Sequence, residues 1–298
     1  HDAMLLNEGV PVEGVGRNMT ILAPYATFPV GTPQYRVRPR ANHYLDNLTL
    51  ADFMLWSDYD GTRRASHSLE ILTDNPTNIT GFEARHLYAR GSLEQSLRIT
   101  NHPNNFQGVP ANMKLSVCQW FEGVLATYHG DNLIVDTCVF RSTGDRPGIR
   151  VYATDTQGVA GNFTVKDSNF DCPGGALHVL RGRNVRIIDN NVEQTSGAGS
   201  NGAVFDLDGA SGLIGGHSSF RGNHCGIFGS ATVECALRVN GVSGLTFEDH
   251  DFESAIATPY GVNVTVAAAN ITRGPGRIAG FGSQVNDPHA RVKQVQTA

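Results

Sequence analysis

The sequence predicts an all-β fold, a right-handed, single-stranded parallel β-helix in which the chain coils rung upon rung with loop insertions. Two repeated phrases and their uneven spacing support this prediction. The first phrase is nine residues long: Asn or Gly, an apolar residue, any residue, an apolar residue, four variable positions, and a large apolar residue. Its clear copies begin at Asn47, Asn112, Asn132, Asn162, Asn184, Gly212 and Gly244, and weaker ones begin at Asn78 and Asn270.

The second phrase is a glycine followed by alternating apolar residues, and it lies between copies of the first. It is clearest at residues 148–153, 202–207 and 261–266. Alternation with a period of two is typical of a strand that buries one face. Each rung should therefore carry at least two short strands, joined by corners where Asn and Gly tolerate a left-handed backbone.

The anchors of the first phrase are unevenly spaced. From Asn112 onward they lie 20 to 32 residues apart, which suits a constant rung with loops of different lengths. A solenoid grows along its axis and needs no larger globular core. We therefore expect one elongated domain over 1–280, and a tail or the start of a further segment over 281–298. Since repeat proteins need capped ends, an N-terminal cap is expected upstream of this sequence.

The ninth position of the first phrase should form a core ladder. Strands of neighbouring rungs lie about 4.8 Å apart, which suits stacked aromatic rings. Cys118 and Cys138 share the seventh position on adjacent rungs and could form a disulfide, but the five cysteines are an odd number and show no metal-ligand spacing, so small buried thiols are the simpler interpretation. The expected ladder is Leu55, Trp120, Phe140, Phe170, Val192, Phe220 and Phe252.

The tenth position supplies the first candidates for catalysis. Asp171 and Glu193 occupy it on successive rungs, so they should lie side by side, flanked by Arg141 and Arg221. Two carboxylates about 5 Å apart match a retaining glycosidase, and a wider gap suits inversion through water. Crowded like charges would raise one pKa, and arginines would orient acidic sugars. A solvated ladder of alternating charges fits the same pattern.

Two further groups of acids lie outside this column. Asp206 and Asp208 leave the second-phrase strand near Arg181 of the preceding rung, and these three residues are candidates for substrate binding. The acids of residues 249–253 could bind Ca²⁺ or simply keep the surface hydrated. We predict no metal site and no cofactor.

A lyase would need a different set of residues, namely a base and a cation that stabilises the enolate next to a uronic acid. Arg181, Arg221 and His224 could serve in these roles. His178 occupies a position expected to face inward, so it is interpreted as a core histidine. The spacing of these residues does not decide between a hydrolase and a lyase.

One outward position of the second strand is apolar on several rungs. Leu125, Leu177 and Val204 share it, interrupted by Arg150. An exposed apolar stripe along a solenoid indicates a partner surface, and a threefold bundle of β-helices would bury it. A long loop folded over this face is the alternative.

Composition narrows the function classes. The net charge of −5 disfavours a nucleic-acid surface, because phosphate binding favours a basic patch. No stretch of about 18 apolar residues is present, so no membrane-spanning segment is expected. Glycine is abundant, and stripes with a helical period are absent.

The start of the sequence resembles a known superfamily. The segment from Gly9 to Leu22 is similar to the G-x-G-R-x-x-T-x-L segment that begins the coil in pectate-lyase-like right-handed β-helices, including bacteriophage tailspikes, and residues 47–53 resemble their next rung. The resemblance covers roughly residues 5–280 and implies a protein that cleaves or binds polysaccharides. The aspartate-rich calcium cluster of pectate lyases and the Asp-Pro-His-Asp motif of epimerases are both missing from the sequence, and residues 286–290 only approach the latter motif.

The resemblance and the candidate residues together predict a tailspike-like depolymerase. It would bind and hydrolyse a bacterial surface polysaccharide, as a homotrimer on a virion or outside a cell, with Asp171 and Glu193 as the catalytic pair. A noncatalytic adhesive fibre and a secreted polysaccharide lyase are the alternatives. Inserts at 57–68, 91–111 and 221–235 are candidates for lining the binding groove.

Overall fold

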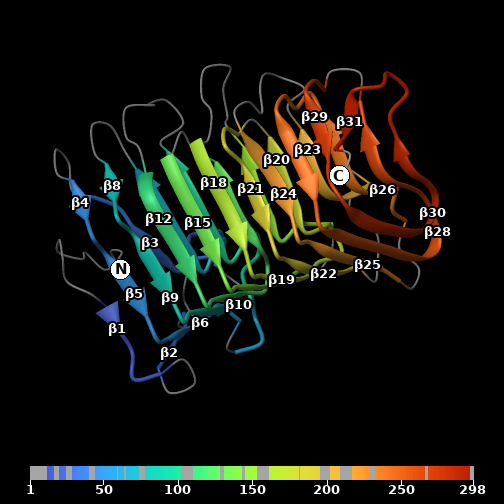
Figure 1. Ribbon diagram of the computed structural model, residues 1–298. Coiled ribbons are helices and arrows are strands. Elements are labelled where there is room, and N and C mark those ends of the chain that lie inside the picture. Colours follow the sequence, from blue (N-terminus) through green and yellow to red (C-terminus); the bar gives the residue numbers. More distant parts are fainter. Residues whose placement is uncertain are drawn as a thin grey trace.

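The computed structural model shows the chain winding into a right-handed parallel β-helix, with rungs succeeding one another from the N-terminal to the C-terminal end (Figure 1). A typical rung has three strands, which form three faces. Face 1 is a thirteen-stranded sheet, and faces 2 and 3 are halves of an eighteen-stranded sheet that β28 and β30 join. The structure describes residues 12–16, 20–24, 29–39, 44–58, 60–63, 65–73, 78–101, 110–127, 131–142, 145–152, 161–180, 182–194, 202–208, 217–228, 232–265 and 268–295.

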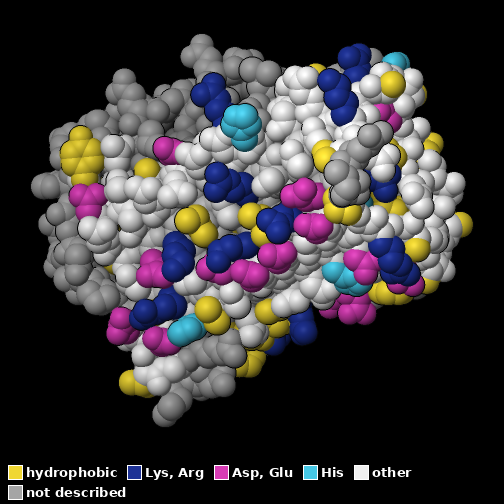
Figure 2. Space-filling model, viewed as in Figure 1, with side chains coloured by type: hydrophobic (Ala, Val, Ile, Leu, Met, Phe, Trp, Pro, Cys, Tyr) yellow, Lys and Arg dark blue, Asp and Glu magenta, His cyan; other side chains and the backbone are white. Residues whose placement is uncertain are grey.

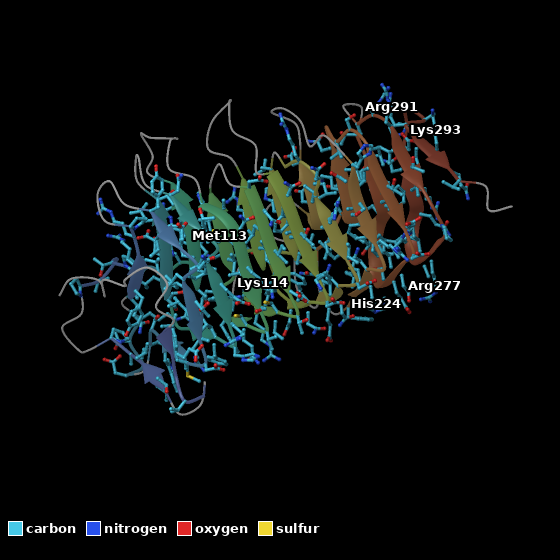
Figure 3. All side chains as sticks on the ribbon, turned by 60° about the vertical axis from the view of Figure 1, so that its left-hand side comes forward. Met113, Lys114, His224, Arg277, Arg291 and Lys293 are labelled. Atoms are coloured by element: carbon cyan, nitrogen blue, oxygen red, sulfur yellow. The ribbon has the colours of Figure 1, made fainter. Side chains whose placement is uncertain are left out.

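Face 1 contains the strands that follow the anchor residues. Leu115 pairs with Val135, and Val135 pairs with Val165, in parallel register. On β12, Met113 is buried and the adjacent Lys114 is exposed, which is the alternation expected of a half-buried strand (Figure 3). The strands of face 1 are β1 (Val12–Glu13), β4 (Leu45–Asp46), β5 (Thr49–Ala51), β8 (Ile79–Thr80), β9 (Glu83–Arg85), β12 (Pro110–Ser116), β15 (Asp131–Asp136), β18 (Gly161–Lys166), β21 (Arg186–Ile188), β24 (Ser218–Arg221), β27 (Leu245–Glu248), β29 (Ile271–Arg273) and β31 (Val292–Gln294).

Faces 2 and 3 follow in each rung. Face 2 forms the lower side of the molecule in Figure 1. Its strands are β2 (Ile21–Leu22), β6 (Met54–Trp56), β10 (Tyr88–Arg90), β13 (Gln119–Trp120), β16 (Val139–Arg141), β19 (Asn169–Asp171), β22 (Asn191–Gln194), β25 (His224–Ile227) and the first parts of β28 (His250–Val264) and β30 (Gly276–Asn286). Face 3 consists of β3 (Tyr35–Val37), β7 (Leu69–Thr73), β11 (Leu97–Asn101), β14 (Val124–Thr127), β17 (Ile149–Tyr152), β20 (Leu177–Leu180), β23 (Ala203–Asp208), β26 (Cys235–Asn240) and the last parts of β28 and β30.

The anchor asparagines form the corners that the sequence predicts. Asn112, Asn132, Asn162 and Asn184 have φ angles between 47° and 65°, a left-handed conformation that asparagine tolerates better than most residues. Their side chains also bond along the axis: Asn184 Nδ2 donates to Asn162 Oδ1 at 2.8 Å, and Asn132 Nδ2 donates to Asn112 Oδ1 at 3.1 Å. The corner is therefore stabilised both within a rung and between rungs.

The ninth-position ladder lies in the core. The rings of Phe140 and Phe170 stack with centroids 4.7 Å apart and an interplanar angle of 10°. Phe220 is buried but belongs to another column, opposite Ile187 and Phe247 on face 1. The ninth position of its rung is Cys225, which pairs with Val192 on face 2.

The seventh position forms a second, polar ladder inside the coil. Cys118 and Cys138 are buried thiols with no disulfide. On the following rungs the position is polar: Ser168 Oγ accepts the Cys138 amide hydrogen at 3.1 Å, and Asn190 Nδ2 donates to Asn223 Oδ1 at 2.9 Å. These bonds satisfy buried polar groups that would otherwise destabilise the core.

The coil continues beyond residue 280. Strand β30 runs across this point, and β31 pairs with β29 on face 1. The described residues thus hold the β-helix as far as Gln294, while the division into a domain and a tail stays a prediction. No helix in the described part of the chain is long and apolar enough to cross a membrane.

Candidate functional site

The middle outward position of face 3 carries ionisable side chains on four consecutive rungs. Arg150 on β17, His178 on β20, Asp206 on β23 and Arg238 on β26 lie directly opposite one another in the strand register. The residues are far apart in the sequence, and the coil brings them into one column.

This register corrects two sequence-based expectations. His178 faces outward, whereas Leu177 lies in the core at 1% exposure. The face 3 strand after Gly175 begins one residue later than the pattern indicates, and a one-residue shift exchanges the two faces of a strand. Val204 is fully buried as well, and Leu125 lies opposite Arg150. The predicted apolar stripe is therefore wrong, and the partner surface inferred from it loses its basis.

The Asp206 carboxylate is contacted by the side chains on both neighbouring rungs of this column. Arg238 Nη1 donates to Asp206 Oδ2 at 3.2 Å, and His178 Nε2 lies 3.8 Å from the same oxygen. Arg238 Nη2 donates to Glu234 Oε2 at 2.6 Å, so one guanidinium bridges two carboxylates. The second oxygen, Asp206 Oδ1, is buried and accepts no hydrogen bond from any described residue.

Burial controls the protonation of the two central groups. Asp206 is 2% exposed and His178 is 7% exposed. Burial raises the pKa of Asp206 to about 6, although the Arg238 charge lowers it and the Asp208 charge adds to the rise. Burial, reinforced by the Arg150 charge, lowers the pKa of His178 to about 4. At mildly acidic pH the site therefore holds a protonated carboxyl beside a neutral imidazole.

Amide side chains on neighbouring rungs hold the two flanking carboxylates. Asn240 Nδ2 donates to Asp208 Oδ1 at 2.7 Å, and Asn263 Nδ2 donates to Glu234 Oε1 at 2.7 Å. Both donors are neutral, so the amides position the two carboxylates without adding charge, and Glu234 is also paired with a cation, Arg238. Asp206 thus lies in a fixed polar frame on an otherwise regular sheet.

The predicted catalytic pair lies on face 2. Asp171 is opposite Arg141, and the pairing of Phe170 with Val192 places Asp171 beside Glu193. Both carboxylates are exposed, and neither makes an ion pair or hydrogen bond with another described side chain. The structure brings the pair together as a solvated feature of a sheet surface.

Arg221 does not flank this pair, so the prediction that it follows Glu193 in the tenth-position column is wrong. It ends β24 on face 1, opposite Glu248, and its Nε lies 3.4 Å from Asp249 Oδ2. The copy of the phrase at Gly212 has the right spacing, but strand pairing aligns Ser218 with Leu245, so His217 and not Gly212 takes the anchor position of this rung. Acidic and basic side chains lie side by side across face 1 (Figure 2), so Arg221 belongs to a mixed charge ladder.

The other predicted residues have simpler positions. Arg181 lies outside the described residues. Within residues 249–253, His250 is buried in the core, whereas Asp251 lies 3.4 Å from His224 Nδ1 and accepts a bond from Arg277 Nη1 at 2.9 Å. His224 and Arg277 project from the same edge of the molecule (Figure 3). Among the described residues, no group of three or more His, Cys, Asp or Glu side chains could hold a metal ion.

Sequence reasoning missed His178, Arg238 and Glu234 as members of one site. The signal for His178 was present, because an outward position follows if the strand begins at Leu177 and not at Ala176. Arg238 joins the site through a contact between rungs, which a single sequence does not display, and Glu234 joins it through Arg238 of the same rung.

Comparison with known proteins confirms the fold and goes no further. No family model matches the sequence, and no curated protein matches it. Among solved structures, the A-module of mannuronan C-5 epimerase AlgE4 from Azotobacter vinelandii is 11% identical, with a TM-score of 0.50, covering 98% of this chain and 85% of the other. DFA-IIIase from Arthrobacter chlorophenolicus without its lid is 11% identical, with a TM-score of 0.51, covering 89% and 74%.

A phage protein has the same fold. Tailspike protein 3 of bacteriophage CBA120 is 12% identical, with a TM-score of 0.53, and the match covers 99% of this chain and 54% of the tailspike. The present sequence therefore spans about half the length of that protein. At these identities the similarity establishes the parallel β-helix, as the sequence predicted.

Proposed function

We propose that this protein binds and hydrolyses an extracellular polysaccharide across face 3, with Asp206 as the proton donor. The observation that carries the proposal is an outward-facing carboxyl that is 2% exposed and has a pKa of about 6. Glycosidases use such a carboxyl to protonate the departing oxygen near neutral pH. The substrate class draws support from two β-helix proteins of similar fold, one named as a mannuronan epimerase and one as a phage tailspike.

The mechanism assigns complementary roles to Asp206 and Asp208. Asp206 gives its proton to the glycosidic oxygen as the bond from that oxygen to the anomeric carbon breaks. Asp208 takes a proton from a water molecule, whose hydroxide forms the new bond to that carbon. Alternate residues of one strand lie roughly 7 Å apart, which fits the wider carboxyl separation of inverting enzymes. The proposal therefore includes inversion at the anomeric carbon.

Incubation with a panel of purified bacterial capsules and O-antigens, followed by mass analysis of released oligosaccharides, tests this function. Hydrolysis adds one water to each repeat unit that is released. The pair Asp171 and Glu193 is the competing catalytic proposal. Loss of product in Asp206→Asn, with full activity in Asp171→Asn and Glu193→Gln, would place the reaction on face 3.

A lyase is the second candidate, favoured by the neutral His178, which lies between Arg150 of the preceding rung and Asp206 of the following one. In that reaction His178 would abstract the proton beside a uronic acid carboxylate, and Arg150 would stabilise the negative charge that develops there. The products would carry an unsaturated end and lack the added water. Binding without any product would instead favour an adhesive fibre.

Location and assembly complete the proposal. A protein with this function would act on a virion or outside a cell, and we propose a homotrimer by analogy with the trimeric tailspikes of the superfamily that the start of the sequence resembles. The analogy is now the only support for the trimer, since the apolar stripe is absent. Analytical ultracentrifugation measures the mass of the assembly directly, and a monomer would remove this part of the proposal.

A further inference from the structure

Face 2 carries a strip of alternating aromatic and cationic side chains on its N-terminal half. Arg90 pairs with Trp56 in the strand register. Phe121 and Arg141 continue the same column on the next two rungs, because Trp120 pairs with Ala89 and with Phe140. Tyr88 stands beside them at the neighbouring outward position, with its ring centroid 4.9 Å from that of Phe121. None of these side chains is buried.

The guanidinium groups and the rings of this strip stack along the helix axis. Arg90 Cζ lies 5.0 Å from the centroid of the Trp56 ring and 6.0 Å from that of Phe121, and Arg141 Cζ lies 5.8 Å from the Phe121 centroid. The Trp56 and Phe121 rings are thus each in cation–π contact with at least one guanidinium group. A stacked guanidinium directs its N–H edges away from the rings, and these edges form the fork that grips carboxylates.

The charges of the strip are incompletely neutralised by the protein. Arg90 Nε lies 3.7 Å from Asp58 Oδ1, a long contact. Arg141 makes no ion pair with a described carboxylate, although Asp171 follows it in the column. The column then changes sign, because Asp171 and Glu193 occupy the next two rungs. An anionic ligand would therefore be attracted to the aromatic half and repelled by the acidic half.

We propose that the strip formed by Trp56, Tyr88, Arg90, Phe121 and Arg141 is a binding platform for an acidic polysaccharide, separate from the face 3 site. The ligand class rests on the proposed function, whereas the location rests on the stacked arginines alone. Binding here would hold a long chain against the protein while another part of it reaches face 3.

The spacing of the arginines favours an extended acidic chain over a single small anion. Arg90 and Arg141 are two rungs apart, a distance of about 10 Å. In an extended glycan with a twofold repeat, the carboxylates of alternate sugars face the same side. If such a chain runs parallel to the helix axis, the carboxylate of one sugar can bind Arg90 and the carboxylate of the next sugar but one can bind Arg141.

Retention of acidic glycans by a cleavage-deficient protein tests the platform. The Asp206→Asn variant is run by affinity electrophoresis in gels that contain alginate, polygalacturonate or hyaluronate, with dextran as the uncharged control. We expect retention by at least one acidic glycan and little by dextran. Adding Arg90→Ala and Arg141→Ala should weaken binding roughly tenfold per arginine, and the corresponding lysine substitutions should restore only part of it, because lysine lacks the planar fork.

The matched control removes two positive charges from face 1. Lys114→Ala with Arg221→Ala changes the net charge equally and should leave retention within about twofold. Equal loss in both double variants, or no retention by any acidic probe, overturns the proposal. If Trp56→Phe changes the sedimentation coefficient but leaves retention in the acidic gels unchanged, the strip is a contact between two copies of this chain and not a glycan platform. Oligosaccharide release by the protein with intact Asp206 is measured separately, so failure of the platform is distinguishable from failure of the proposed hydrolysis.

Discussion

Faces 2 and 3 both present acidic residues at outward positions, but in different surroundings. On face 2, Asp171 and Glu193 stand side by side in solvent. On face 3, Asp206 is enclosed by Arg238 and His178, and burial raises its pKa to about 6. The position in the repeat therefore determines whether a side chain faces inward or outward, whereas the side chains of neighbouring rungs determine its burial and its pKa.

The largest expected difference between the two faces is in catalysis. Asp206→Asn should reduce oligosaccharide release by about 10²- to 10⁴-fold, the usual contribution of general acid catalysis. The substitution keeps the size of the side chain but cannot deliver a proton as the carboxyl does. Initial rates of product release, measured at substrate saturation, test the prediction. Activity within a few fold of the natural protein would show that Asp206 is not the acid.

The pH dependence of cleavage should identify the protonated form of Asp206 as the active one. Because the pKa is about 6, the rate should fall roughly tenfold for each unit of pH above that value. A pH profile of kcat/KM, which reports the pKa values of the free enzyme, tests this expectation. Arg238→Gln is the informative variant, since loss of the charge that lowers the Asp206 pKa should move the falling limb to higher pH. An unmoved limb would assign it to another group.

The burial of Asp206 should also affect the pH dependence of the free energy of unfolding, which can be measured without any substrate. The folded-state pKa of Asp206 is raised from 3.8 to about 6, so its contribution to stability is present below pH 3.8 and is lost as the pH rises through 6. The Asp206→Asn variant has no carboxyl to ionise at this position, so it does not lose stability in this way as the pH rises. The free energy of unfolding of the variant relative to the natural protein should therefore rise by on the order of 2 kcal/mol between pH 4 and pH 7. Urea denaturation at the two pH values measures the difference, and a constant offset would contradict it.

Much of the fold could be predicted because its determinants are local. The asparagine corners require a left-handed backbone, and period-two alternation marks strands, so Asn112, Asn132, Asn162 and Asn184 were sufficient to place their rungs. The rung after Asn184 was misaligned, because glycine and leucine at 212 and 213 imitate an anchor whose place strand pairing gives to His217.

The site was predictable only in part because its contacts run between rungs. Asp206 and Asp208 were found from their outward position, but as binding residues only. The partner Arg238 lies 32 residues further along the chain from Asp206, and the lengths of the intervening loops decide which side chains meet. His178 was missed through a register shift of one residue, because the sequence around Gly175 allows the strand to begin at either Ala176 or Leu177.

The smallest expected effect belongs to the exposed pair on face 2. The double variant Asp171→Asn and Glu193→Gln should change the free energy of unfolding by less than about 0.5 kcal/mol, since solvent already surrounds both carboxylates. Its cleavage rate should match that of the natural protein in the same product assay. If cleavage is lost while stability is unchanged, the comparison reverses: the exposed carboxylates perform the chemistry, and the enclosed Asp206 serves to hold face 3 together.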